Sequence, residues 1–531
     1  MADQNPITVR SALPAEVNKI DIFSNEDPEK KADLRGGLVR LQYYESILQD
    51  TVRVTVFYAD SGSTIEKDGK LVSAVEGLPI VGQERVELIF TDNNENELKF
   101  TKEDENNLYV NKYTPVTEDS TRSLVMLDLV SKEYILNEKI RLNTRFNGPI
   151  SEHVKGILTE AKTAKDGDKE KTNKKYLDTK KELFIEETTG NYIFCGGNKK
   201  AFYTMNWLSK KAVPGGGKDR DDTDSRKGDD GALGNSAGYF FWETSKGFHF
   251  RSIEWLMDKE MNPKRKSIIY NDTPDKMPQG YDIKALSMDK DNRLDIQKKL
   301  MMGAFSTRTI VFNPFNCLYE VITPNAYGNK SAKASQDNLK LAGEKLPVMN
   351  PEFDMDGPKT GNTDKDGDKE KTKEGSPAGT GDCGDKAEIS ASKEFSRTQY
   401  MLIDSGTLID DGSKDPKTWS EGAEKQLKKS KKDQNFEIKD ILSQSSMRYN
   451  QLYSSKISIT IPGDFSLHAG DSIFFDGPQL TGDDKKDSID EKDGGLYIIA
   501  DICHYSSSKE TYTKMNLVRD STERKGTATG G

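Results

Sequence analysis

Two pairs of carboxylates are the residues of this sequence best suited to acid–base chemistry. Glu152 with Glu160, and Asp221 with Asp224, could supply the acid and the base of a cell-wall hydrolase. Such a pair works only in a shaped cleft that raises the pKa of one member. Both pairs lie in polar stretches that indicate exposure to solvent. We therefore expect no catalytic pair here, and a chain that is not an enzyme.

Histidines and cysteines are the next candidates, as metal ligands or nucleophiles. The histidines are His153, His249, His468 and His504, and the cysteines are Cys195, Cys317, Cys383 and Cys503. None is spaced as a zinc pair, and the cysteines do not form a disulfide framework. We therefore expect reduced thiols, no metal and no cofactor. His468 and His504 are predicted at a barrel surface or in a turn, and Cys503 as a small buried residue in a strand.

Two short motifs resemble ligand-binding loops without their defining residues. The Gly-Gly-Gly-Lys at 215–218 is followed by Asp219, whereas a phosphate-binding loop needs Ser or Thr there, between a strand and a helix. The octapeptide KDGDKEKT at 165–172 recurs at 365–372 and begins like a calcium loop. It lacks the glycine at the sixth place and the glutamate at the twelfth. We predict solvated surface loops in both places.

The elements that would position any site must come from two or three domains. Single cores stop growing near about 250 to 300 residues, and this chain has 531. Hydrophobic residues make up 34% and charged residues 31%, and the mean hydropathy is −0.77. The net charge of −10 argues against binding a nucleic-acid backbone, which needs a basic face. An acidic lining would instead suit a channel through which DNA slides without sticking.

Several segments are expected to lie outside any core. The stretches 163–179, 213–236 and 325–394 have too little apolar surface to offset the entropy of ordering them. The first ten residues lack a basic stretch followed by an apolar one, and no window approaches about 18 uninterrupted apolar residues. We expect polar loops in the first three stretches, and neither a signal peptide nor a membrane-spanning segment.

The N-terminal part has the alternation of antiparallel strands. In the segment Leu38–Tyr58, Val52, Val54 and Val56 alternate with polar residues, which is typical of a half-buried strand. Similar strand-like stretches follow at 86–90, 97–100, 108–114 and 122–129, and Asn93-Asn94 supplies a turn between two of them. These patterns predict a first antiparallel β-barrel over residues 1–130.

The middle of the chain changes to helical spacing. Ser131–Leu142 is expected to be a helix, and Ser151 is the predicted N-cap of a second. The aromatic stretch Tyr239–Asp258 predicts a hairpin that turns at Lys246-Gly247, followed by a short helix. Its aromatic side chains could line a platform for a sugar or a base, but core packing is the preferred interpretation.

The C-terminal part returns to strands. Ile457, Ile459 and Ile461 alternate, and 497–505 with 512–518 predict a final hairpin. The predicted fold class is α+β, mainly antiparallel β, with two tube-like β-barrel domains, a small α/β insertion domain and long loops. The predicted limits are 1–130 for the first barrel, 131–308 for the connecting domain, 309–345 with 390–525 for the second barrel, and 346–389 for a low-complexity loop.

Three passages together carry a family resemblance. They are Leu38–Tyr58, AGYFFWETSKGFHFRSIEWL at 237–256, and the closing IPGDFSLHAGDSIFF and GGLYIIADICHYSSSKETYTKMNLVRD. In their order they resemble the baseplate hub family of contractile-tailed phages, in particular the cyanophage-type myoviruses. The closing passages are similar to a tube-barrel signature shared with the spike proteins of related injection machines: a Pro-Gly turn, a Gly-Asp step and a terminal hairpin ending in Leu-Val-Arg-Asp.

The resemblance implies a structural subunit of a virion tail baseplate, assembled in the host cytoplasm. It implies a homotrimer whose paired barrels imitate sixfold symmetry, joining the tail tube or a tube-initiating protein to the central spike, with baseplate wedge proteins as further partners. DNA would pass through the channel without specific binding, and no membrane insertion is expected. Our candidate subunit contacts are Ile135, Leu142, Val154 and Ile157 in the helical region.

Two alternatives remain at this stage. One is the tail-tip cell-wall hydrolase that would use the carboxylate pairs above. The other is a spike subunit of a related injection system, which would carry a β-helical needle of repeated short strands. The sequence after the final hairpin reads Gly-Thr-Ala-Thr-Gly-Gly, so we expect no needle in this chain.

Overall fold

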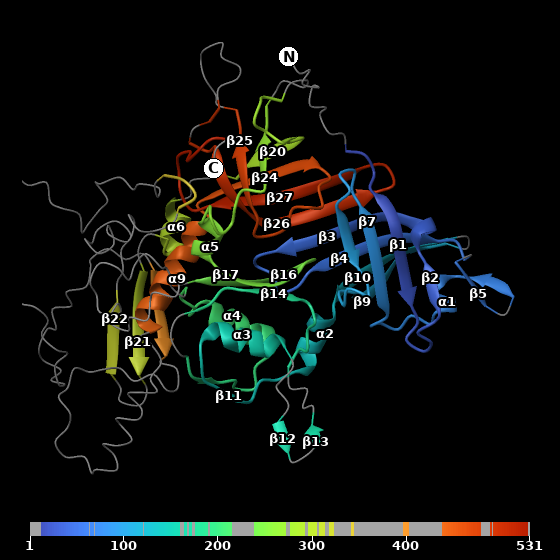
Figure 1. Cartoon of the computed structure of the whole chain (residues 1–531), viewed down its shortest axis with the longest axis horizontal. Helices are drawn as coiled ribbons and strands as arrows, with labels where there is room; N and C mark the ends of the chain where they lie inside the picture. The colour runs from blue at the N-terminus through green and yellow to red at the C-terminus, as the bar shows by residue number, and fades with distance from the viewer. Residues whose placement is uncertain are drawn as a thin grey trace, which may run out of the picture.

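The structure is a computed structural model, and it confirms the mainly antiparallel β fold with short helices (Figure 1). It describes residues 12–62, 64–67, 69–119, 122–159, 164–166, 169–171, 176–188, 192–214, 238–271, 277–291, 296–304, 307–313, 318–322, 341–344, 397–402, 438–478, 489–490 and 492–528. Most described strands belong to one 15-stranded sheet that runs through both ends of the chain.

The large sheet has a main path and four side strands. In spatial order the path is β19 (Ile283–Lys284), β18 (Lys266–Ile269), β25 (Ser472–Asp476), β26 (Gly495–Ser507), β3 (Leu38–Ser46), β4 (Arg53–Asp60), β10 (Ser123–Ser131), β9 (Leu108–Glu118), β7 (Arg85–Thr91), β1 (Glu16–Phe23) and β2 (Lys31–Asp33). Beside it, β27 (Thr511–Arg519) pairs with β26 and with β24 (Ser455–Pro462), β24 also pairs with β20 (Ser287–Lys290), and β8 (Glu97–Phe100) pairs with β7. Among the described residues no pairing closes this sheet on itself.

The strands from β1 to β10 enclose their own core, and we call this part the N-terminal β-unit. Val52, Val54 and Val56 point inward and are buried, as the alternation predicts. The predicted single strand over Leu38–Tyr58 is two strands, β3 and β4, which pair with each other. One inserted segment, β5 (Ile65–Lys67), β6 (Lys70–Val72) and α1 (Ala74–Gly77), extends from its far end (Figure 1).

The C-terminal β-unit consists of β18 to β20 and β24 to β27, with a second core. Ile457, Ile459 and Ile461 are fully or almost fully buried in it, which confirms the alternation of β24. The predicted final hairpin is confirmed as β26 and β27. The two β-units are joined directly, because β26 pairs antiparallel with β3 from Asp501 opposite Ser46 to Ser507 opposite Arg40.

A third, mixed unit lies under this junction. Its elements are α2 (Lys132–Lys139), β11 (Arg145–Phe146), α3 (Ile150–Leu158), β14 (Glu182–Ile185), β15 (Phe194–Cys195), α4 (Ala201–Ser209), β16 (Tyr239–Thr244), β17 (Gly247–Ser252) and α5 (Ile253–Met257). The predicted aromatic hairpin is confirmed as β16 and β17, and its aromatic side chains are core residues. Gly247 is required where β17 begins, since a Cβ there would lie 2.1 Å from the Glu182 carbonyl oxygen of the parallel strand β14.

Two local predictions of the middle region are wrong. Ser151 does not cap α3, because Pro149 precedes the helix in an extended conformation and Ser151 lies in its first turn. Its hydroxyl accepts a hydrogen bond from the Thr188 amide at 3.3 Å instead. The first octapeptide copy contributes to two short antiparallel strands, β12 (Ala164–Asp166) and β13 (Lys169–Lys171). The second copy, at 365–372, lies outside the described residues.

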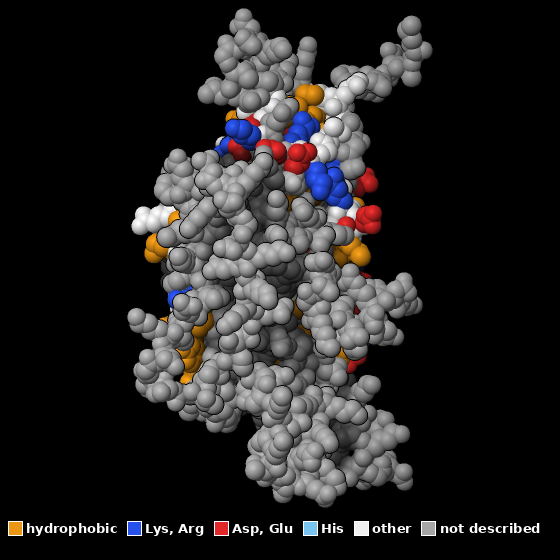
Figure 2. Space-filling model, turned by 90° about the vertical axis from the view of Figure 1, so that its left-hand side faces the viewer, with side chains coloured by type: hydrophobic (Ala, Val, Ile, Leu, Met, Phe, Trp, Pro, Cys, Tyr) orange, Lys and Arg blue, Asp and Glu red, His pale blue; other side chains and the backbone are white. Residues whose placement is uncertain are grey.

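The second β-unit has different members from those predicted. Residues 309–345 were assigned to it, but β21 (Thr307–Asn313) and β22 (Leu318–Ile322) pair with β23 (Arg397–Leu402) in a separate three-stranded sheet. Helices α6 (Ile296–Met302) and α9 (Ile438–Leu452) pack against this sheet. Figure 2 views the molecule from this side and shows apolar side chains on both flanks. The short strands β18 and β20, from the predicted connecting domain, belong to the C-terminal β-unit. No local sequence pattern indicates this membership.

Candidate functional site

The candidate site is one face of an eight-strand band that crosses both β-units. In spatial order the band is β20, β24, β27 and β26, continued by β3, β4, β10 and β9. Side chains alternate between the two faces of each strand, so the face opposite the cores carries the remaining residues. On β24, for example, Lys456, Ser458 and Thr460 alternate with the buried isoleucines. We call this surface the polar face.

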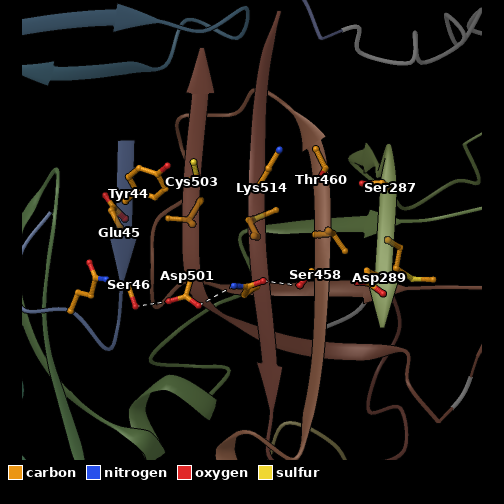
Figure 3. A pocket seen from close by; sticks show the side chains of 16 residues that line it. Tyr44, Glu45, Ser46, Ser287, Asp289, Ser458, Thr460, Asp501, Cys503 and Lys514 are labelled. Carbon is orange, nitrogen blue, oxygen red and sulfur yellow. Dashed lines mark hydrogen bonds between the residues drawn. The ribbon is translucent and has the colours of Figure 1, made fainter. Parts of the chain in front are cut away.

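A chain of side-chain hydrogen bonds crosses the polar face at the junction (Figure 3). The Ser458 hydroxyl donates to Asn516 at 2.7 Å, and the Asn516 amide donates to Asp501 at 3.1 Å. The Ser46 hydroxyl donates to the other oxygen of Asp501 at 2.5 Å. Four strands from the two β-units are thereby tied together by polar side chains that satisfy one another.

A shallow hollow of about 490 Å³ surrounds this chain of hydrogen bonds. Its lining includes Tyr44, Cys503 and Lys514, which lie in one row across β3, β26 and β27. Burial raises the pKa of the Cys503 thiol, and burial together with that thiol raises the pKa of Tyr44 to about 12. Both groups are therefore protonated and uncharged at neutral pH. Cys503 lies in a strand as predicted, but it is half-buried at this surface and not a core residue.

The polar face continues over the N-terminal β-unit with fewer mutual hydrogen bonds. The Thr55 hydroxyl donates to Asp128 at 3.1 Å, and Lys112 lies opposite Asp128 in the register of β9 and β10. The Arg40 guanidinium lies 3.8 Å from the centre of the Phe57 ring. This half therefore exposes cations to solvent more openly than the other.

The charge of the polar face differs from that of the whole chain. Its basic residues are Arg40, Arg53, Lys112, Lys456 and Lys514, and its acidic residues are Asp128, Asp289 and Asp501. The chain carries a net charge of −10, yet cations outnumber anions on this face. The acidic lining that the composition suggested is therefore not found here.

A buried carboxylate behind the polar face holds three parts of the chain together. The Glu45 side chain is fully buried and accepts hydrogen bonds from the Tyr43 hydroxyl at 2.5 Å, the Ser245 amide at 3.0 Å and the Ala469 amide at 2.9 Å. His468 Nδ1 lies 3.1 Å from it. Burial alone would raise the pKa of Glu45, but His468 and these donors lower it to about 2. The ionised carboxylate thus links β3, the hairpin β16–β17 and the loop 463–471.

The prediction of a barrel surface or a turn is confirmed for His468 and wrong for His504. His468 lies in a turn, but it is buried beside Glu45. His504 is completely buried, and its ring stacks on Tyr43 with centroids 5.9 Å apart. Its Nε2 lies 3.1 Å from the Leu467 carbonyl oxygen and its Nδ1 lies 3.0 Å from the Thr513 hydroxyl. Strand alternation turns His504 inward on β26, and the loop 463–471 carries His468 to Glu45 on β3.

A buried charge cluster fixes the mixed unit to the same junction. The Lys181 ammonium pairs with Glu133 at 3.2 Å and with Glu243, whose other oxygen accepts from the Val52 amide at 3.1 Å. Burial acts to lower the pKa of Lys181, but the two carboxylates raise it. Lys181 is therefore charged, and α2, β16 and the turn before β4 are held together.

The predicted subunit contacts are core residues of the mixed unit. Leu142, Val154 and Ile157 are buried with exposed fractions of 1% or less, and Ile135 is half-buried. The apolar face of these helices is covered by the chain itself, so a role for them between subunits is not proposed further.

The carboxylate pairs are not brought together in any described cleft. Glu152 is exposed on α3, while Glu160, Asp221 and Asp224 lie outside the described residues. Within the described ranges, no three His, Cys, Asp or Glu side chains gather in a way that could hold a metal ion. No helix in the described part of the chain is both long and apolar enough to cross a membrane.

Comparisons with known proteins give structural likenesses only. No protein-family model matches the chain, and no curated protein sequence is a significant match. The chain is similar to the 43 kDa tail protein of prophage MuSo2 from Shewanella oneidensis, with 8% identity, a TM-score of 0.40, and coverage of 95% of this chain and 98% of that chain. Prophage tail protein gp18 from Listeria monocytogenes gives 8% identity, a TM-score of 0.41 and 94% coverage of both chains.

A third likeness is to the Escherichia coli c3393 protein, a component of the type VI secretion system, with 7% identity and a TM-score of 0.35 over 97% of this chain and 79% of that one. At these identities and TM-scores, nothing of those proteins' function carries over to this chain. Phage tail and baseplate proteins are among the structures that it resembles.

Proposed function

We propose that this chain is a structural baseplate hub subunit of a phage contractile tail and not an enzyme. Three copies would form a pseudo-sixfold ring that connects the tail tube, or a tube-initiating protein, to the central spike, with wedge proteins around it. The observation that carries this proposal is the eight-strand band, which consists of two four-strand halves joined through β26 and β3.

Each half of the band has the features of one tube-like unit. The half with β3, β4, β10 and β9 is antiparallel, and so is the half with β20, β24, β27 and β26. Each has its own core behind it. Three chains would therefore present six similar halves, so that a trimer meets a sixfold tube on one side and a threefold spike on the other. We propose 12–131, and 266–290 with 455–519, as these two units.

The ends of the band are where neighbouring copies would meet. Among the described residues, no strand pairs with the outer edge of β9 over 114–117 or with the outer edge of β20. Exposed strand edges are normally covered or paired in stable assemblies. Val116 on β9 is 47% exposed, an aliphatic side chain at one of these edges.

The polar face would then line the channel of the ring. Its hydroxyl and amide groups at the junction hydrogen-bond to one another or to Asp501. They are therefore poorly placed to form specific hydrogen bonds with nucleic-acid bases. Its charges have both signs, which limits tight phosphate binding along the channel. DNA would pass without specific binding, in a virion tail that assembles in the host cytoplasm.

Sedimentation of the purified chain with an edge variant tests the ring. Val116→Lys places a charge at the outer edge of β9, and we expect it to convert trimer to monomer while the far-ultraviolet circular dichroism is unchanged. The matched control is Leu71→Lys, at an aliphatic side chain that is 63% exposed on β6, away from the band. A wild-type chain that stays monomeric at high concentration and with its spike partner would contradict the proposal. Clearing of a peptidoglycan suspension by the purified chain would contradict the non-enzymatic role.

A further inference from the structure

Histidines are gathered at the junction of the three units. The chain has four histidines, and His249, His468 and His504 all lie near Glu45, each supplied by a different element. His249 comes from β17, His468 from the loop 463–471, and His504 from β26. The fourth, His153, lies in the core of the mixed unit. Because histidines gain charge in mildly acidic solution, three of them where the units meet could make the contacts between the units depend on pH.

His504 is completely buried, and its surroundings favour the neutral imidazole with one ring proton. Because the Leu467 carbonyl oxygen can only accept, Nε2 carries the proton and Nδ1 faces the Thr513 hydroxyl. The Phe465 ring packs edge-on against the imidazole at 5.2 Å, and Tyr43 stacks on it. A second proton would place a positive charge between two aromatic rings without a carboxylate in direct contact.

His249 is half-buried and is held between two aromatic rings. Its ring stacks between Trp242, at 4.9 Å, and Phe184, at 4.6 Å. The Trp242 indole donates to the Ala469 carbonyl at 3.0 Å, and the same ring is 2.6 Å from where a Cβ on Gly470 would lie. The imidazole therefore lies between β16 and β14, and the Trp242 ring on which it stacks also contacts the loop 463–471.

The other charged groups around the cluster do not offset new positive charge fully. They are Glu45 on β3, Glu243 on β16, Lys246 and Arg251 beside His249, and Asp464 and Asp471 in the loop. Glu45 is already engaged by four donors, and Glu243 by Lys181 and the Val52 amide. Lys246 and Arg251 add repulsion to any charge on His249.

We propose that this junction is an acid-sensitive latch: protonation of His249 and His504 breaks the hydrogen bonds that the loop 463–471 and the hairpin β16–β17 make to Glu45 on β3, while the strands of the two β-units stay paired. The latch belongs to a single chain, so it does not depend on the proposed ring. It would let the angle between the two halves of the band change without unfolding either half.

The pKa values give the direction and the pH range. Burial lowers the pKa of His504 to about 4 and that of His249 to about 3, whereas an exposed histidine titrates near about 6.5. The open form therefore binds more protons than the closed form below pH of about 6.5. Each pH unit between about 6.5 and 4 raises the ratio of open to closed latch up to about tenfold for each histidine.

Hydrogen exchange of the full chain from pH 7.5 to 4.5, corrected for the intrinsic effect of pH, tests the latch. We expect the amides of Ser245 and Ala469, which bind Glu45, to lose at least tenfold of their protection by pH 5. The amides of β9 and β10 should keep theirs. In the double variant His249→Phe with His504→Asn, the phenyl ring keeps the stack at position 249 but loses the hydrogen bond to Thr244, and the amide keeps hydrogen-bonding groups at position 504. This variant should stay protected to lower pH.

The matched control is His153→Asn, because burial also lowers the pKa of His153 but it lies in a different core. This variant should open at the same pH as the wild type. The latch is wrong if all amides lose protection together, if protection persists in the wild type at pH 4.5, or if the double variant opens at the wild-type pH. If the double variant fails to fold at pH 7.5, the comparison of the two sets of wild-type amides decides the question.

Discussion

The two halves of the band have the same strand arrangement but are assembled differently. The N-terminal β-unit builds its core from one continuous stretch of chain, with Phe465 as the single contribution from elsewhere in its described core. The C-terminal β-unit collects its core from segments as distant as Ile47, Trp242, Ile268 and Val518. Folding of the second half therefore needs long-range contacts that the first half does not.

The polar face shows a matching difference. In the C-terminal half, Ser458, Asn516 and Asp501 satisfy one another, with Ser46 completing the chain from the other half. In the N-terminal half, Arg40 and Lys112 face solvent with fewer polar neighbours. Two similar frameworks thus carry one surface that is internally hydrogen-bonded and one that is more cationic.

The largest expected effect comes from removing the carboxylate that joins the halves. Glu45→Ala leaves His468, the Tyr43 hydroxyl and two amides buried without their acceptor, which should lower the free energy of unfolding by about 3 to 5 kcal/mol. Guanidinium denaturation measures this loss. Glu45→Gln keeps an acceptor of similar size and should lose less. Equal stability of Glu45→Ala and the wild type would show that the halves do not depend on this contact.

The next effect comes from the side chain that the C-terminal part inserts into the N-terminal core. Phe465 is 2% exposed there, so Phe465→Ala should cost about 3 kcal/mol and uncouple the two halves in thermal unfolding. Leu127→Ala, on β10 within the N-terminal β-unit itself, is the control that weakens the same core. A single cooperative transition in Phe465→Ala would contradict the uncoupling.

A smaller effect is expected from acid. Because burial lowers the pKa of His504 to about 4, its folded form binds fewer protons than its unfolded form below about pH 6.5, so stability is present above that pH and is lost as the pH falls toward 4. At pH 5 this amounts to about 2 kcal/mol. Denaturation at pH 7 and pH 5 measures the difference, and His504→Asn should reduce it. An unchanged difference in that variant would assign the pH dependence to other groups.

The smallest effect concerns the polar face. Asn516→Ala breaks two hydrogen bonds between half-exposed groups that water can partly replace, so we expect a loss of about 1 kcal/mol. Thr55→Val removes one hydrogen bond in the other half and should cost less. Equal free energies of unfolding for both variants, measured by urea denaturation, would show that the hydrogen bonds of the two surfaces do not differ in their contribution to stability.

Much of the fold follows from local sequence. Val52, Val54 and Val56, the isoleucines of β24 and the aromatic hairpin were found because each strand alternates over a short distance. The same local reasoning assigned 309–345 to the wrong sheet, since the choice of partner strand depends on tertiary packing. Four-residue strands such as β18 and β20 carry too little pattern to be found at all.

The junction was missed for a related reason. Glu45 follows Leu41 and Tyr43 in the inward phase of β3, so a carboxylate on the core side was visible in the alternation. Its partners Ser245 and Ala469 are separated from it by 200 and 424 positions, and no local signal joins them. The inward direction of His468 and His504 likewise depends on the second half packing on the first. Leu142, Val154 and Ile157 were predicted as subunit contacts but are buried within the chain. An apolar helix face indicates burial, but it does not indicate whether the same chain or a second subunit covers it.

The central claim is that two similar halves per chain let three chains imitate a hexagon. Averaged face-on electron micrographs of the purified chain, alone and with its spike partner, test it most directly. We predict rings with threefold symmetry and six similar lobes around an open channel. Compact monomers, or rings with any other symmetry, would contradict it.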